Sequence, residues 1–157
     1  MDFDDDSDEL PAGDVAQPGG MAYFGYRLAV TAKLFDRRFA ALLMAHSDLT
    51  LPQWRCLAQL GLAEPGTVRS LADGAAVDRA EVSRSLARLV EQGLVNRQDN
   101  ADDQRSPHFT LTPFGKALFE RLRAPVGQFV HGLIDPIAPE DMAAADRVLA
   151  AMARGCG

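Results

Sequence analysis

Two short amphipathic segments, joined by only four residues, limit the possible folds of this 157-residue chain more than any other feature. The first segment starts after Thr67, and the second runs over about residues 79–92. Residues 74–77 join them, and Ala72 places a small side chain where two closely linked helices must approach each other. This arrangement predicts a helix-turn-helix.

The second segment carries local signals for a helix and two faces of different chemistry. Asp78 and Glu81 have the spacing of a capping box, and Gly93 supplies a stop. The apolar face is predicted to contain Val82, Leu86, Leu89 and Val90. The opposite face contains Ala80, Arg84, Ala87 and Glu91, with Ser83 and Arg88 beside them.

The polar face of this helix has the chemistry of a DNA-groove reader. Arginine bonds a guanine edge with two donors or contacts a phosphate, and serine does either. Small alanines let a helix approach the bases closely. A solvated face with ordinary surface charges is the alternative interpretation, and this helix alone does not decide between the two.

A β-hairpin is predicted directly after Gly93. Residues 94–97 and 108–111 are short strand-like runs, separated by a polar loop at 99–107. Arg105 lies among three carboxylates of the loop, so one of them, such as Asp103, would hold it in a fixed direction. A fixed arginine suits a narrow minor groove with its negative potential. The alternative is a solvated turn with an incidental ion pair worth roughly 0–1 kcal/mol.

Apolar residues at three-, four- and seven-residue steps predict four further helices. They span about residues 21–46, from 51 to the glycines at 61–66, 113–135, and from 139 onward. Thr50 and Thr112 are the expected N-caps of two of them, and Pro125 is expected to bend the third. The chain is therefore predicted to be mainly α-helical, with four helices, a small β-hairpin and two more helices in that order.

The charge of the chain is unevenly distributed. The formal net charge is −6, but residues 1–19 hold seven acidic and no basic residues. The remainder carries 16 basic and 15 acidic groups, which does not argue against a nucleic-acid partner. Residues 1–19 have few large apolar side chains, so we predict a disordered tail. We expect this tail to compete with phosphate for the basic surface.

Residues 49–122 contain six motif segments in a fixed order. They are Leu49-Thr50-Leu51-Pro52-Gln53-Trp54, Leu71-Ala72, Val77-Asp78-Arg79-Ala80-Glu81-Val82-Ser83-Arg84, Leu89-Val90-Glu91-Gln92-Gly93-Leu94-Val95, Asp103-Gln104-Arg105 and Leu111-Thr112-Pro113-Phe114-Gly115. Taken together, these segments resemble the MarR family of bacterial winged helix-turn-helix regulators. The resemblance implies a transcription regulator that acts as an obligate homodimer, most simply a repressor at a pseudo-palindromic operator. It places a recognition helix in the major groove and an arginine of the hairpin, the wing, in the minor groove.

The resemblance divides the chain into four parts. These are an acidic tail at 1–19, a dimerisation helix at 20–48, a DNA-binding lobe at 49–112 and C-terminal dimerisation helices at 113–157. Eight residues are expected to contact DNA: Arg79, Ala80, Ser83, Arg84, Arg88, Gln104, Arg105 and His108. Asp103 is expected to orient the wing.

Two departures from the family pattern affect these expectations. Ala80-Glu81 stands where the family often has hydroxyl residues, so the family's sequence preference does not transfer to this chain. Pro107 precedes the returning strand and cannot donate to the hairpin ladder. His108 then either contacts phosphate when charged or is a partly exposed strand residue without a special role.

The resemblance also implies a cleft for a small anionic or phenolic ligand between the dimer helices and the DNA-binding lobe. Six candidate residues lie on the helices that would line it: Tyr23, Arg27, Phe35, His46, Trp54 and Arg55. Aromatic rings would form the floor and cationic groups would hold a carboxylate. Structural roles are the alternative, with Trp54 and Phe35 in the core and Arg55 paired with a carboxylate.

Other classes of function find less support in the sequence. Cys56 lies in an apolar segment and Cys156 is next to last, so both are expected to be reduced thiols. A thiol-based redox sensor and a winged-helix protein-interaction module are the alternative functions. Enzyme, cofactor and metal motifs are missing from the sequence, so none of these is expected. Without a long apolar run or a signal region, the chain is expected in the cytoplasm and not at a membrane.

Overall fold

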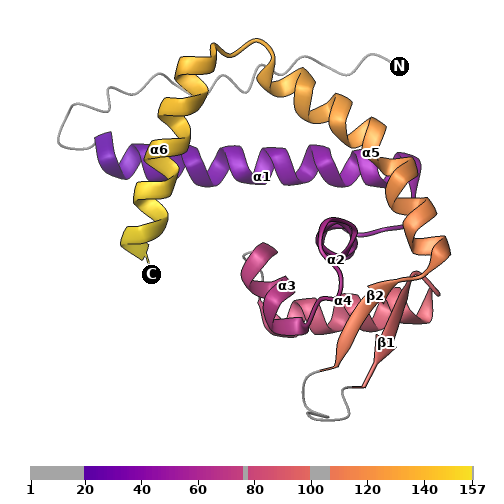
Figure 1. The fold of residues 1–157 in the computed structure, drawn as a ribbon. Helices are drawn as coiled ribbons and strands as arrows, with labels where there is room; N and C mark the ends of the chain where they lie inside the picture. The colour runs from indigo at the N-terminus through magenta and orange to yellow at the C-terminus, as the bar shows by residue number, and fades with distance from the viewer. Residues whose placement is uncertain (1–19, 76–77, 100–106, 157) are drawn as a thin grey trace.

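The computed structural model describes residues 20–75, 78–99 and 107–156 of the chain (Figure 1). Its elements are α1 (Gly20–His46), α2 (Leu51–Leu62), α3 (Val68–Ala75), α4 (Arg79–Glu91), β1 (Val95–Gln98), β2 (His108–Leu111), α5 (Pro113–Ile134) and α6 (Pro139–Cys156). The predicted order of elements and the mainly helical class with a small β-hairpin are confirmed. The predicted disordered tail lies outside the described residues.

Side-chain caps explain where α2 and α5 begin. Gln53 Oε1 accepts a hydrogen bond from Thr50 N at 2.8 Å, and Thr50 Oγ1 accepts one from Gln53 N at 3.5 Å, which completes a capping box. Thr112 Oγ1 accepts from Gly115 N at 2.9 Å and donates to Gly93 O at 2.7 Å. Thr112 therefore starts α5 and also ties it to the end of α4.

Two glycines allow α4, the hairpin and α5 to meet. Gly93 follows α4 in the left-handed region, with φ of 69°, and so ends the helix as predicted. Gly115, in the first turn of α5, faces the backbone of Leu94, and a Cβ at this position would collide with the Leu94 carbonyl oxygen. The first glycine is required by its conformation and the second by the available space.

The core of the lobe at residues 49–112 is built around α2, which packs against α3, α4 and α5. The largest fully buried side chains are Leu43, Leu57, Leu60, Val82, Leu86, Leu89 and Leu122. Three of them, Val82, Leu86 and Leu89, belong to α4. Because a close-packed core resists displacement of its side chains, the position of α4 is fixed from its inner face.

The hairpin is joined to both neighbouring parts of the lobe. Strands β1 and β2 pair antiparallel along their full length. Gly66 and Phe109 form a further antiparallel bridge, with N···O distances of 3.0 and 2.8 Å. The carboxylate of Glu64 accepts a hydrogen bond from Leu111 N at 2.6 Å and lies 3.3 Å from Lys116 Nζ. The residues before α3 and the start of α5 therefore both hold the hairpin in place.

Three long helices extend away from this lobe. Figure 1 shows α2, α3, α4 and the hairpin on one side of α1, with α5 leading from the hairpin towards α6. The α-helix of α5 continues through Pro125 without interruption, so the bend expected there stays a prediction. None of residues 139–155 of α6 is buried. Large exposed apolar side chains on these helices are Tyr26, Leu28, Phe35, Met44, Phe114, Leu133, Met142, Val148 and Leu149.

Candidate nucleic-acid interface

The exposed face of α4 carries the side chains that the sequence predicts for a DNA-groove reader. Exposed on this face are Ala80, Ser83, Arg84, Ala87, Arg88 and Glu91, whereas Val82, Ser85, Leu86 and Leu89 are buried. The expectation for Val90 is wrong, because this residue is 36% exposed and Ser85 is buried instead. At about 100° per residue, Ser85 lies closer than Val90 to the centre of the buried stripe.

Asp78 begins α4 as predicted, but its hydrogen bond differs from the expected one. The Asp78 carboxylate accepts from Ala80 N at 2.7 Å. No hydrogen bond from Glu81 that would complete a capping box is found within the described residues. The negative charge of Glu81 instead acts on the buried thiol of Cys56. The cap is therefore confirmed, while the reciprocal partner is not.

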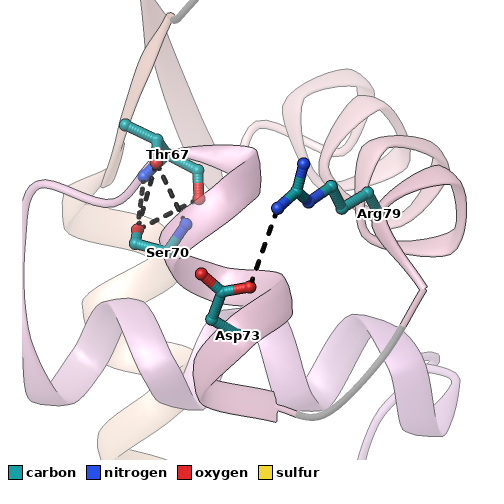
Figure 2. A network of polar contacts seen from close by, with 4 residues as sticks. All are labelled: Thr67, Ser70, Asp73 and Arg79. Atoms are coloured by element: carbon teal, nitrogen blue, oxygen red, sulfur yellow. Dashed lines mark hydrogen bonds and ion pairs between the residues drawn. The ribbon is translucent and has the colours of Figure 1, made fainter. Parts of the chain in front are cut away.

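Figure 2 shows the polar contacts that position α3 and connect it to α4. Thr67 N donates to Ser70 Oγ at 2.9 Å, and Ser70 N donates to Thr67 Oγ1 at 3.1 Å, so the two residues close the first turn of α3. Arg79 Nη2 lies 4.0 Å from Asp73 Oδ1. Sequence reasoning missed the role of Asp73, because only the fold brings the end of α3 to the start of α4.

The three arginines of α4 differ in their partners. Arg88 Nη1 lies 2.9 Å from Glu91 Oε2, and Arg79 lies near Asp73. Arg84 is exposed and has no ion pair or hydrogen bond to any side chain within the described part of the chain. Since a guanidinium has five N–H donors, Arg84 is the cation of α4 with its full donor set available to a ligand.

Grooves lie on both sides of the exposed face of α4. One has a volume of about 460 Å³, lies against the start of α2, and is lined in part by Arg84 and Arg88. The other has a volume of about 440 Å³, lies against the hairpin, and is lined in part by Ser83 and Arg97. The exposed face of α4 therefore stands between two grooves, and a DNA major groove is wide enough to admit an α-helix. Arg97 of β1 was missing from the predicted contact residues, although it adds a positive charge beside the exposed face of α4.

The structure describes the base of the wing but not its tip. Asp103, Gln104 and Arg105 lie outside the described residues, so the expected contact between Asp103 and Arg105 stays a prediction. His108 is half-buried at the start of β2, and its Nδ1 is buried without a hydrogen-bond partner among the described residues. This position fits a strand residue, and a contact between His108 and phosphate stays a prediction.

A single chain does not gather the six candidate ligand residues into one site. Tyr23 and His46 lie at opposite ends of α1, which separates them by about 35 Å along a helix. Trp54 is buried, and its ring centroid lies 6.1 Å from that of Phe119. The structural interpretation of Trp54 as a core residue is therefore correct.

The remaining candidates also differ in their surroundings. Arg55 Nη2 lies 2.8 Å from Asp36 Oδ1, so the structural interpretation of Arg55 is correct. Phe35 is 39% exposed in the single chain, so its interpretation as a core residue is wrong there. Its ring lies 5.7 Å from Phe39 and 5.5 Å from Phe129, at the surface of an aromatic cluster between α1 and α5.

The buried cysteine has the properties of an unreactive thiol. Burial, and to a lesser extent the charge of Glu81, raises the pKa of Cys56 from 9.0 to about 11. Cys56 thus behaves as a small buried apolar residue, while the side chain of Cys156 lies outside the described part.

Within 20–75, 78–99 and 107–156, no cluster of acidic, histidine or cysteine side chains is placed to hold a metal ion. The helices of these ranges are also too short or too polar to cross a membrane.

Sequence comparisons relate the lobe to known proteins. Residues 47–106 match the profile of the MarR family. The uncharacterised HTH-type transcriptional regulator YhjH of Bacillus subtilis is 35% identical over 72 residues, which are 46% of this chain and 41% of that protein. The multiple antibiotic resistance protein MarR of Escherichia coli is 34% identical over 84 residues, or 54% and 58% of the two chains. The chain thus aligns with about half the length of these relatives.

The structural comparison extends beyond the helix-turn-helix and the wing. A mutant MarR from Escherichia coli, solved in complex with operator DNA, has a similar fold with a TM-score of 0.75 and 26% sequence identity. The match covers 85% of this chain and 96% of that one, so it includes flanking helices as well as the lobe. Together with the family match, this likeness confirms the resemblance seen in the sequence. Residues 47–106 of this chain are thus similar to the MarR family, and the fold of the chain is similar to that of a MarR regulator.

Proposed function

We propose that this chain is a sequence-specific DNA-binding transcription regulator, acting as a homodimeric repressor that a small anionic or phenolic ligand releases. The observation that carries the proposal is the exposed face of α4, where Arg84 has no partner within the described residues. The opposite face of α4 is buried in the core, so the helix would present this face rigidly. The operator-DNA complex of the structurally similar MarR supports this use of the fold.

The proposed interface combines base reading and phosphate contacts. Arg84 and Ser83 would reach base edges in the major groove, while the small Ala80 permits close approach. Arg79 and Arg88 form exposed ion pairs worth roughly 0–1 kcal/mol, so exchanging them for phosphate contacts costs little. The wing residues Gln104, Arg105 and His108 complete the proposed set of contacts.

A homodimer is supported by the uncovered apolar side chains on α1, α5 and α6. Tyr26, Leu133 and Leu149 are exposed in the single chain, although apolar area gains about 25 cal/mol per Å² when it is removed from water. A second copy would bury such a surface through a two-fold axis and would present two copies of α4. Two recognition helices related by this axis match a pseudo-palindromic operator.

Release by a ligand requires that the ligand prefer one geometry of the dimer. We place this ligand between the dimer helices and the lobe. The exposed side chain of Phe35 supports such a site, and Arg27 lies about two turns earlier on the same helix. Trp54 and Arg55 already have structural partners and therefore support the site less.

Selection from fragmented genomic DNA tests the proposal. The purified full chain should retain a small set of fragments, and its affinity for them should fall steeply with added salt, because binding releases counterions from the phosphates. Circular dichroism of the same preparation controls for folding. A folded chain that retains no fragment above background would contradict DNA binding and favour the protein-interaction alternative.

A further inference from the structure

A cavity of about 350 Å³ lies where the α1–α2 connection, the end of α4 and the start of α5 meet. Its lining includes the buried side chains of Leu49, Leu94 and Leu118, and Phe114, which is 66% exposed. Small-molecule sites typically have volumes of about 300–1,000 Å³ and mostly apolar walls. The cavity is separate from the six candidate ligand residues, none of which lines it.

Two opposite charges line the same cavity without being paired. Asp48 and Arg121 are both exposed lining residues. Neither has an ion pair or a side-chain hydrogen bond within the described ranges. By contrast, Arg123, two residues further along α5, lies 3.0 Å from Glu120. The cavity therefore offers apolar walls together with one available carboxylate and one available guanidinium.

We propose that this cavity binds a small amphipathic zwitterion, of the class of α-amino acids with an apolar or aromatic side chain. The ligand carboxylate would pair with Arg121, and its ammonium group would pair with Asp48. The side chain of the ligand would contact Leu49, Leu94 and Leu118. A simple acid leaves Asp48 facing a like charge, and a simple amine does the same at Arg121, so both bind more weakly than the zwitterion.

The position of the cavity connects it to the recognition helix. Gln92, the C-cap residue of α4, is part of the lining, and Ala117 and Arg121 contribute from α5. A ligand in the cavity bridges the end of α4 and the helix that leads to the proposed dimer interface. Occupancy should therefore change the affinity for DNA. This regulatory role rests on the proposed function, whereas binding of the zwitterion does not.

Calorimetric titration of the full chain with three matched probes tests the binding. The probes are L-phenylalanine, 3-phenylpropionate, which lacks the ammonium group, and 2-phenylethylamine, which lacks the carboxylate. Phenylalanine should bind about tenfold more tightly than either of the others, because it alone forms both charged contacts. The titration contains no DNA, so its result is independent of the proposed function.

Single substitutions assign the contacts. Arg121→Gln should weaken phenylalanine and phenylpropionate about tenfold, and it should not weaken phenylethylamine, which no longer faces a like charge. Asp48→Asn should weaken phenylalanine and phenylethylamine, and it should not weaken phenylpropionate for the same reason. Ala117→Trp should abolish binding of all three probes by filling the cavity. Arg123→Gln is the matched control on α5, since Arg123 does not line the cavity, and should leave all affinities unchanged.

Three results would overturn the site: no phenylalanine binding to the folded wild-type chain, equal affinity for the three probes, or unchanged binding after both Arg121→Gln and Asp48→Asn. These two exposed substitutions test the site even if Ala117→Trp does not fold. The regulatory role has its own readout, which is the affinity for a selected DNA fragment with and without phenylalanine. If phenylalanine binds and the DNA affinity does not change, the site stands and its regulatory role is wrong.

Discussion

Arg84 differs from the other arginines of α4 because no side chain within the described residues occupies its donors. Arg88 shares its charge with Glu91 at 2.9 Å, and Arg79 lies 4.0 Å from Asp73. An arginine without a local partner loses no ion pair when it meets a base. Among single residues, we therefore expect Arg84 to read the base sequence and the two paired arginines to contact phosphates.

Replacing Arg84 tests this assignment. Arg84→Ala should weaken binding to a selected DNA fragment about 10- to 100-fold, because a bidentate contact to a base contributes roughly 1–3 kcal/mol of discrimination. Binding to a random duplex of equal length should weaken less. Fluorescence anisotropy at one salt concentration measures both affinities, with Arg123→Ala on α5 as the control. Equal losses on the two duplexes would mean that Arg84 contacts only phosphate.

Cys56 gives a second prediction at this scale. A Cys156→Ser variant leaves Cys56 as the remaining thiol of the chain. Because the pKa of Cys56 is raised to about 11, this thiol should react slowly with a thiol reagent at neutral pH and faster as the pH approaches 11. The folded chain also holds this proton more tightly than the unfolded chain. Its contribution to the free energy of unfolding is thus complete below about pH 9 and is lost as the pH rises through 11. Rapid labelling of the folded variant at neutral pH would contradict this environment.

At the scale of elements, the junction of α4, the hairpin and α5 controls the direction in which α5 leaves the lobe. Thr112 donates to Gly93 O at 2.7 Å and caps α5 through Gly115 N at 2.9 Å. Gly115 also lies directly against the Leu94 carbonyl. Because α5 leads from the lobe to α6, this junction sets the spacing between α4 and any dimer interface.

The fit at this junction is tested by two glycine substitutions within α5. Gly115→Ala should lower the free energy of unfolding by about 1–3 kcal/mol, because the added Cβ has to displace the Leu94 backbone. Gly127→Ala should raise it by about 0.5–1 kcal/mol, since nothing lies within 4 Å of the added Cβ and alanine favours a helix. Urea denaturation measures both changes. Similar effects of the two substitutions would contradict the close approach at Gly115.

How far the sequence predicts the structure also depends on the element. Thr50, Thr112 and Gly93 act on their own turns of the chain, so their caps and stops were predictable from neighbouring residues. The burial of Ser85 and the exposure of Phe35 depend on how helices pack, which periodicity describes only approximately. Contacts between separate elements, such as Asp73 with Arg79 or the cavity at Asp48 and Arg121, have no local signal in the sequence.

At the scale of the whole molecule, the exposed apolar side chains of α6 are part of the proposed dimer interface. Leu149→Glu should shift the chain towards monomer, because a charge would enter an apolar interface. Ala143→Glu is the matched control, since Ala143 is exposed and lies on the side of α6 away from Val148 and Leu149. Analytical ultracentrifugation measures the dissociation constant of both variants. A wild-type monomer, or a dimer insensitive to Leu149→Glu, would contradict this interface.

Footprinting of the wild-type chain on a DNA fragment selected from the genome tests whether a dimer of this chain binds one specific site. We expect one protected pseudo-palindromic site, whose two half-sites are separated by about one helical turn, roughly 34–36 Å, because a two-fold dimer presents two copies of α4. Arg84→Ala should remove the protection at the same protein concentration. Uniform weak protection without a preferred site, or protection of a single isolated half-site, would contradict sequence-specific binding by a dimer.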